Sequence, residues 1–340
     1  MKTKSLVSLL LVLAFVLMVG CAPAAQVPVV PASEPAAAPS TEAAESAPVV
    51  QAEGKMKIGF CVADADDQWL SYLYNEAQNF AKENPDFDFL FGDGRNDLAE
   101  QTNVIENWIM QGVDAIVVNP FDSESTGTFI DMCHNAGIKI ISVNRPLANQ
   151  DSADGGCYGD SKQSGIMNMQ YLADKLEGKG KVAIFVGEPA QEAAILRTEG
   201  FKEVIASYPD IEIVFEQTGH WNRDEGMKLM EDLLQSGQEV DCIASNNDEM
   251  AIGAYLALQN ANNTHIIIGG IDASPDALQY LGSDSQYVVT VFQDARGQAY
   301  GALGLAVALL KGEVVEKEVL IPYELVTPDL KDKYLKIWGK

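Results

Sequence analysis

The chain is poor in the residues that build metal and nucleophile sites. Its 340 residues include five cysteines and three histidines. No two cysteines form a C-x-x-C pair, and His134, His220 and His265 lie far apart in the sequence. This spacing argues against a structural zinc site. Cys61 and Cys242 lie in apolar, strand-like runs and are predicted to be buried free thiols, although the sequence alone leaves a disulfide open.

Basic residues are also scarce. Lysine and arginine together number 23 against 49 acidic residues, and the formal net charge is −26. Such a charge argues against nucleic acid and against anionic lipid as partners. The acidic residues are spread along the chain, which indicates a solvated surface rather than a single site.

Motifs of covalent and phosphate chemistry are absent from the sequence. It contains no G-x-S-x-G, no H-E-x-x-H and no G-x-x-x-x-G-K-[ST]. Gly92-Asp93-Gly94 lacks the third glycine of a dinucleotide fingerprint, and the adjacent Cys133 and His134 would point in different directions on one helix. We therefore predict no cofactor and favour binding over catalysis.

The first residues indicate export. Lys2 and Lys4 precede an apolar run over residues 6–20, which is too short to span a bilayer and is typical of a signal peptide. The run ends at Gly20-Cys21 and resembles the lipobox of bacterial lipoproteins, which implies that Cys21 carries a lipid. The alternative is an ordinary signal with a chance cysteine. Residues 21–54 follow as a predicted disordered linker, because residues 22–54 hold six prolines, eleven alanines and no aromatic residue.

Apolar runs and helical patterns then alternate along the chain. Strands are expected at 56–63, 87–91, 115–119, 138–144, 181–187, 211–216, 241–245, 266–271 and 288–292. Helices are expected at 69–82, 99–110, 125–136, 193–207, 225–235, 249–259 and 275–281. One strand–helix–strand pattern recurs at an offset of 127 residues (114 to 241) and 128 residues (144 to 272). This predicts an α/β fold of two similar, doubly wound parallel-sheet domains, with ligand loops at the carboxyl ends of the strands.

Several loops after predicted strands carry polar or aromatic side chains. Asp67 and Trp69 suit a hydroxylated ligand, since a carboxylate accepts hydroxyl hydrogen bonds and a ring covers C–H surface. The alternatives are a helix cap for Asp67 and a core position for Trp69. Calcium is not expected there, because an EF-type loop counted from Asp64 has Trp69 where glycine is needed. Three further loops carry Asn144-Arg145, Asn247 and Asp272; Asn247 has a plain alternative as a helix cap.

Five blocks resemble, in the same order, the periplasmic sugar-binding proteins of ABC importers, above all the galactose/glucose and ribose types. The blocks begin at Asp66-Asp67-Gln68-Trp69, Gly159-Asp160-Ser161, Gly187-Glu188-Pro189, Asn246-Asn247-Asp248 and Gly270-Ile271-Asp272. The resemblance implies sugar-contacting roles, with Trp69 and Trp221 facing each other across the ring, for the following set: Asp67, Trp69, Asn144, Arg145, Gln191, Arg197, Trp221, Asn247, Asp272 and Gln293. Gln191 stands where the glucose type has histidine, which leaves the identity of the sugar open. The glucose type also carries a calcium loop, for which 178–180 is too short, so no metal is expected.

The resemblance further implies two lobes joined by three crossings near Gly159, Gln293 and Tyr323. The expected lobes are 56–159 with 294–323, and 160–293 with 324–340. The expected function is that of a monomeric, lipid-anchored, extracytoplasmic binding protein that delivers a neutral monosaccharide or polyol to an ABC permease and its ATPase. Asp67 and Asp272 balance Arg145 and Arg197, so no charged ligand is favoured. The alternatives are a sensor for a chemoreceptor or kinase, and an extracellular carbohydrate-active enzyme.

Overall fold

A computed structural model describes residues 54–339 of the chain. The predicted signal peptide, Cys21 and the linker as far as residue 53 lie outside these residues. Within 54–339, no helix combines the length and the apolar character that a membrane crossing requires.

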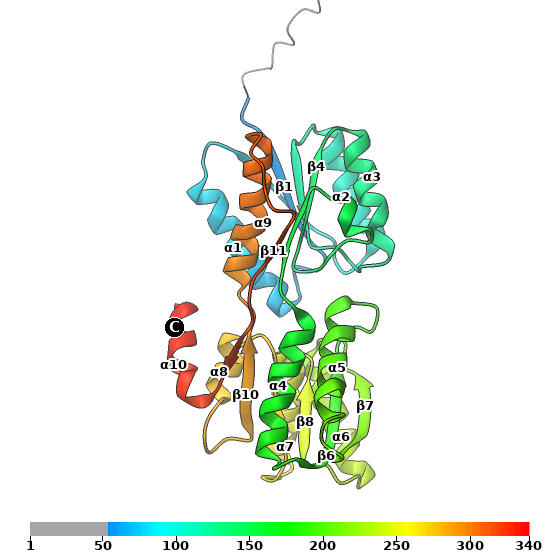
Figure 1. The fold of residues 1–340 in the computed structure, drawn as a ribbon, viewed down its shortest axis with the longest axis vertical. Coiled ribbons are helices and arrows are strands. Elements are labelled where there is room, and N and C mark those ends of the chain that lie inside the picture. The colour runs from blue at the N-terminus through cyan, green and yellow to red at the C-terminus, as the bar shows by residue number, and fades with distance from the viewer. Residues whose placement is uncertain (1–53, 340) are drawn as a thin grey trace, which may run out of the picture. The chain divides into compact units, whose positions relative to one another are not determined.

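The first sheet contains six parallel strands in the order β11-β5-β4-β3-β1-β2 (Figure 1). These strands are β1 (Lys57–Val62), β2 (Asp88–Asp93), β3 (Ala115–Val118), β4 (Lys139–Val143), β5 (Gly155–Tyr158) and β11 (Glu318–Leu320). Successive residues of a strand point to opposite faces, so Phe60 and Cys61 belong to different cores. The core on one face includes α1 (Gln68–Glu83) and α9 (Ala295–Leu310), and that on the other includes α2 (Leu98–Met110) and α3 (Thr128–Asn135).

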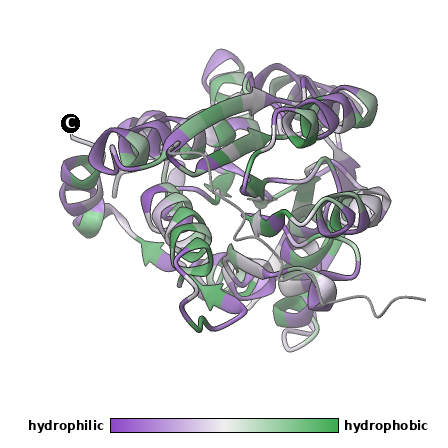
Figure 2. Ribbon diagram, turned by 90° about the horizontal axis from the view of Figure 1, so that it is seen from above, coloured by the Kyte–Doolittle hydropathy of each residue, from purple (hydrophilic) through white to green (hydrophobic). Residues whose placement is uncertain are grey.

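The second sheet repeats this order as β12-β10-β9-β8-β6-β7. Its strands are β6 (Lys179–Val186), β7 (Asp210–Thr218), β8 (Cys242–Ser245), β9 (Ile267–Gly269), β10 (Tyr287–Phe292) and β12 (Glu324–Val326). One face is covered by α4 (Ser161–Lys175) and α5 (Glu192–Ile205). The other is covered by α6 (Arg223–Ser236), α7 (Asp248–Asn260), α8 (Pro275–Tyr280) and α10 (Lys331–Ile337). Apolar residues are concentrated on the strands and on the helix faces turned toward them (Figure 2).

The α/β prediction with two similar sheets is confirmed, with one departure. The repeat predicted from the sequence is visible in the pairs β3 and β8, and β4 and β9, which take corresponding places in the two sheets. The departure is β12, which pairs with β10 in antiparallel orientation at the sheet edge. An antiparallel edge strand on an otherwise parallel sheet is common, because the edge needs no crossover helix.

Three connections pass from one sheet to the other. They follow β5, β10 and β11, at residues 159–160, 293–294 and 321–323. We propose two lobes, 56–159 with 294–323 and 160–293 with 324–340, because the three connections lie at these boundaries. Below, the lobe that contains the first sheet is called the first lobe and the other the second lobe.

The sequence patterns missed several elements. The predicted helix over 125–136 is instead a 3₁₀ turn, Ser125–Gly127, followed by α3. β5 was missed because it is a short run that begins with two glycines. α9 was missed because it is apolar on nearly all sides and shows no helical periodicity. Two further 3₁₀ turns lie at Gln150–Ser152 and Pro328–Leu330.

The four cysteines of the described chain are buried free thiols: Cys61, Cys133, Cys157 and Cys242. The prediction for Cys61 and Cys242 is therefore confirmed, and the possibility of a disulfide among these four that the sequence left open is not realised.

Candidate functional site

All ten residues singled out from the sequence line one pocket, together with Ala63, Asp64, Leu70, Asn96, Glu188, Ala193 and His220. The residues come from loops after strands of both sheets, from the first turn of α1 and from α5. Parallel sheets bind ligands at the carboxyl ends of their strands because the loops of several strands converge there. The pocket thus brings together side chains as far apart in the sequence as Asp67 and Gln293.

Asp67 and Trp69 stand at the start of α1. Asp67 Oδ1 accepts the Leu70 amide at 2.8 Å, so Asp67 is a helix cap, as its alternative interpretation held. The cap uses one carboxylate oxygen and leaves the other able to accept a ligand hydroxyl. Burial raises the pKa of Asp67, an effect that the Leu70 amide opposes. Trp69 is 8% exposed and belongs to the core of the first lobe while lining the pocket.

Asn144 and Arg145 follow β4. Asn144 has a φ of +66°. Its side-chain Oδ1 accepts from Asn119 Nδ2 at 3.0 Å, and its Nδ2 donates to Gln298 Oε1 at 3.3 Å. Arg145 Nη1 donates to the carbonyl oxygens of Pro120 and Phe121. Protein atoms therefore already take much of the hydrogen-bonding capacity of both side chains. Burial lowers the pKa of Arg145 to about 10.

Gln191 connects the two lobes. Its Oε1 accepts from Arg145 Nη2 at 2.7 Å and from Trp221 Nε1 at 2.8 Å. The Trp221 indole lies against Gly187, where an added Cβ would come within 2.2 Å of the ring. Glycine at this position therefore leaves the space that the aromatic ring occupies.

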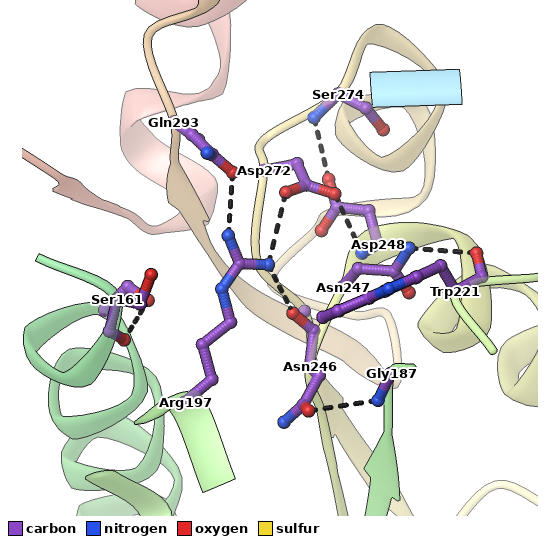
Figure 3. Close-up of polar contacts among 12 residues, drawn as sticks. Ser161, Gly187, Arg197, Trp221, Asn246, Asn247, Asp248, Asp272, Ser274 and Gln293 are labelled. Atoms are coloured by element: carbon purple, nitrogen blue, oxygen red, sulfur yellow. Dashed lines mark hydrogen bonds and ion pairs between the residues drawn. The ribbon is translucent and has the colours of Figure 1, made fainter. Parts of the chain in front are cut away.

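Arg197 is the most heavily bonded side chain of the pocket. It projects from α5 and is 3% exposed. Nη1 donates to Asn246 O at 2.7 Å, and Nη2 donates to Gln293 Oε1 at 2.7 Å and to Tyr323 OH at 3.1 Å. Nη1 also lies 3.7 Å from Asp272 Oδ1, and Figure 3 shows Arg197 between Gln293, Asp272 and Asn246. Two of these partners lie at or beside the connections between the sheets, so Arg197 ties the pocket to the connecting segments.

Asp272 and Asn247 complete the second lobe's contribution. Burial raises the pKa of Asp272 well above its usual value, although the nearby Arg197 opposes this effect. Asn247 Oδ1 caps α7 by accepting the Met250 amide at 3.0 Å, and its Nδ2 donates to Trp221 O at 3.0 Å. The capping interpretation of Asn247 is therefore correct, and the same side chain also fixes the backbone that presents Trp221.

The sequence argument missed part of the lining. Asp64 and Glu188 add two acidic side chains, and Glu188 pairs with His220 at 2.7 Å. The predicted balance concerned Asp67 and Asp272 against Arg145 and Arg197; over the whole lining, carboxyl groups outnumber guanidinium groups. Tyr323 was expected only at a crossing, and no local signal in the sequence points to its bond with Arg197. In the described part of the chain, no group of three His, Cys, Asp or Glu residues is arranged to hold a metal ion.

Comparison with known proteins explains this arrangement. The model of the periplasmic binding protein domain matches residues 58–314. The chain belongs to this family. Membership implies an extracytoplasmic location and a role in binding rather than catalysis.

Relatives of this periplasmic binding protein bind sugars and polyols. A putative rhizopine-binding protein of Rhizobium meliloti is 39% identical over 79% of this chain and 89% of its own length. The ribose import binding protein of Bacillus subtilis is 32% identical over 69% of this chain and 75% of its own. A solved ABC transporter solute-binding protein of Bacillus halodurans, with bound myo-inositol, is 41% identical, has a TM-score of 0.80, and matches over 83% of this chain and 98% of its own. This periplasmic binding protein is thus a member of a sugar- and polyol-binding group of ABC solute-binding proteins.

Proposed function

We propose that the protein binds a neutral monosaccharide or polyol between its two lobes and delivers it to an ABC permease and its ATPase. The observation that carries this proposal is the convergence of two indole-bearing residues, three aspartates and two arginines on one pocket. An indole face covers the C–H surface of a ring, and carboxylates accept the hydroxyl hydrogens around its edge.

The ten pocket residues singled out from the sequence are proposed to have different roles in binding. Asp67 and Asp272 accept ligand hydroxyls, while Trp69 and Trp221 flank the ring. Arg197 donates toward the ligand beside Asp272, since both side chains line the pocket and Arg197 Nη1 lies 3.7 Å from Asp272 Oδ1. The other five residues hold the walls of the pocket in place and contact the ligand with the hydrogen-bonding groups that remain free: Asn144, Arg145, Gln191, Asn247 and Gln293. An acceptor-rich lining of this kind suits a ligand that presents many hydroxyl donors.

A cyclic polyol is our first candidate ligand. The support is the 41% identical solute-binding protein of Bacillus halodurans, whose solved structure contains myo-inositol. Ribose is the second candidate, supported by the 32% identical ribose import protein.

The proposal extends to location and assembly. We propose that Cys21 is lipidated after removal of residues 1–20, and that residues 21–54 form a linker between the lipid and a monomeric two-lobed domain. A Pro-rich chain of this length reaches up to roughly 100 Å at about 3 Å per residue. Ligand binding then draws the lobes together about the three connecting segments, because full hydrogen bonding needs groups from both lobes.

Titration calorimetry against a panel tests the ligand. The panel holds myo-inositol, scyllo-inositol, D-ribose, D-glucose, D-galactose and xylitol. We expect one member of the panel to bind with one site per chain and an affinity in the micromolar range or tighter. No heat from any member, on a protein shown to be folded by its melting transition, would contradict the proposal.

A further inference from the structure

The backbone that presents Asp272 is in an unusual conformation. Asp272 has a φ of +132° and Ala273 a φ of +49°, although neither is glycine. Residues held in such regions are strained and persist only where the surroundings over-determine them. Some group must therefore hold the 272–274 segment in place.

Asp248 supplies that hold. Its carboxylate is fully buried at the start of α7, below the pocket, and it is absent from the pocket lining. Oδ2 accepts the Ser274 amide at 2.7 Å, and Oδ1 accepts the hydroxyls of Tyr287 and Thr290, each at 2.7 Å. Figure 3 shows the contact between Asp248 and Ser274 beside Asp272.

The second bond to the segment runs through Thr290. The Thr290 hydroxyl donates to Asp248 Oδ1 at 2.7 Å. The hydroxyl oxygen is then oriented to accept the Ala273 amide, which lies 3.0 Å away. Asp248 thus fixes two successive amides of the segment, Ser274 directly and Ala273 through one hydroxyl.

Gly270, just before the 272–274 segment, shows how closely the Asp248 carboxylate approaches this part of the backbone. A Cβ at Gly270 would come within 2.4 Å of Asp248 Oδ1 and 2.0 Å of the Tyr287 hydroxyl. The backbone amide of Asp248 also faces Asp272 Oδ2 at 3.4 Å. The start of α7 therefore touches the segment at the Asp272 side chain and at the Ser274 amide, and it reaches the Ala273 amide through Thr290.

We propose that Asp248 is a positioning residue for ligand binding: it aims Asp272 into the pocket and sets its distance from Arg197. This inference rests on the proposed ligand-binding role of Asp272. Asp248 itself touches no ligand, so its effect on affinity must pass through Asp272.

Two readouts on the full chain test the inference. The first needs no ligand and follows amide hydrogen exchange in Asp248→Ala. We expect exchange at residues 272–274 to rise at least tenfold while the centres of α7 and β10 keep their protection. Glu249→Ala is the matched control, because Glu249 is the next residue of the same helix turn but pairs with Arg223 at 2.8 Å, outside the pocket lining. Unchanged exchange at 272–274 in Asp248→Ala would overturn the inference.

The second readout is a double-mutant cycle with Asp272→Asn, using myo-inositol as the probe and D-ribose if the wild type binds ribose more tightly. We expect Asp248→Ala to weaken binding at least tenfold in the wild type and less than threefold when Asp272 is already replaced, because coupled residues are not additive. Equal losses in both backgrounds, or a loss below threefold in the wild type, would overturn it.

Should Asp248→Ala fail to fold, Asp248→Asn keeps the shape and one acceptor, and the same two readouts apply. If Asp272→Asn alone leaves affinity unchanged, the proposed role of Asp272 fails, whereas the exchange readout still decides what Asp248 holds.

Discussion

Arg145 and Gln191 meet across the pocket, with Arg145 Nη2 donating to Gln191 Oε1 at 2.7 Å. Arg145 follows β4 of the first lobe, and Gln191 precedes α5 of the second. The same oxygen accepts from Trp221, so one amide joins the first lobe to the indole of the second. We therefore regard Gln191 as a link between closure of the lobes and the placement of Trp221.

Removal of that link should weaken ligand binding. Gln191→Ala deletes the bonds from Arg145 and Trp221 and a third, longer bond from Gln191 Nε2 to Phe121 O at 3.4 Å. Hydrogen bonds of this kind are worth about 0.5–1.5 kcal/mol each, and we expect a loss of roughly tenfold in affinity by calorimetry. Gln191→Glu is the control, because its carboxylate can accept from both Arg145 and Trp221. Small-angle scattering at saturating ligand should show a larger radius of gyration for Gln191→Ala than for the control. Equal affinity and equal radius in the two variants would contradict the link.

Trp221 should behave as a binding residue rather than as a core residue. Its ring rests on Gly187, its indole nitrogen bonds Gln191, and it is half-buried. We expect Trp221→Ala to weaken binding at least tenfold while it changes the melting temperature by only a few degrees. Trp108, which is 5% exposed in the core of the first lobe, is the matched control: Trp108→Ala should lower the melting temperature sharply. A collapse of the melting temperature in Trp221→Ala with affinity retained would make Trp221 a core residue.

The strand-end argument and the family resemblance led to all ten predicted residues, and the structure places all ten at one pocket. Their roles in binding remain predictions. The sequence could not indicate how much of each side chain the protein itself uses. Arg145 is largely taken up by the carbonyl oxygens of Pro120 and Phe121, and Asn247 Nδ2 donates to Trp221 O; these partners come from distant segments. The helix cap of Asn247, by contrast, was an alternative that the sequence offered. Asp248 escaped notice for a related reason: next to Asn247 it resembles an ordinary acidic first turn, and its partners on β10 are about forty residues away.

The raised pKa of Asp272 makes its charge a cost to the ligand-free fold. A carboxyl whose pKa is higher in the folded than in the unfolded state lowers stability as pH rises from the usual carboxyl pKa through the raised value. Asp272→Asn removes this titration. We expect the ligand-free variant to melt at a higher temperature than the wild type at pH 7, with the difference shrinking as pH falls toward 4. Melting curves over pH 4–8 check this, and a variant that melts lower than the wild type at pH 7 would contradict it.

Cys21 should carry the membrane anchor. Cys21→Ser removes the only thiol in the predicted lipobox, so we expect an uncleaved precursor that takes up no lipid. A palmitate analogue added to expressing cells should label the wild type alone. A second acylation signal is not needed, since two acyl chains on one cysteine give firm attachment. Equal labelling of both proteins would remove the lipobox interpretation and leave an ordinary signal peptide.

The central claim is that this pocket binds a sugar or polyol through Asp272 and Arg197, whose charged groups lie 3.7 Å apart. The most direct test is calorimetry of the tightest-binding panel member on the wild type, Asp272→Asn, Arg197→Ala and the double variant, each first shown to be folded by its melting curve. Hydrogen bonds to charged groups contribute about 1.5–3 kcal/mol, so each single variant should lose roughly ten- to 150-fold in affinity. The double variant should lose less than the product of the two, because removal of one partner already disturbs the other. Losses below threefold in both single variants would contradict the account.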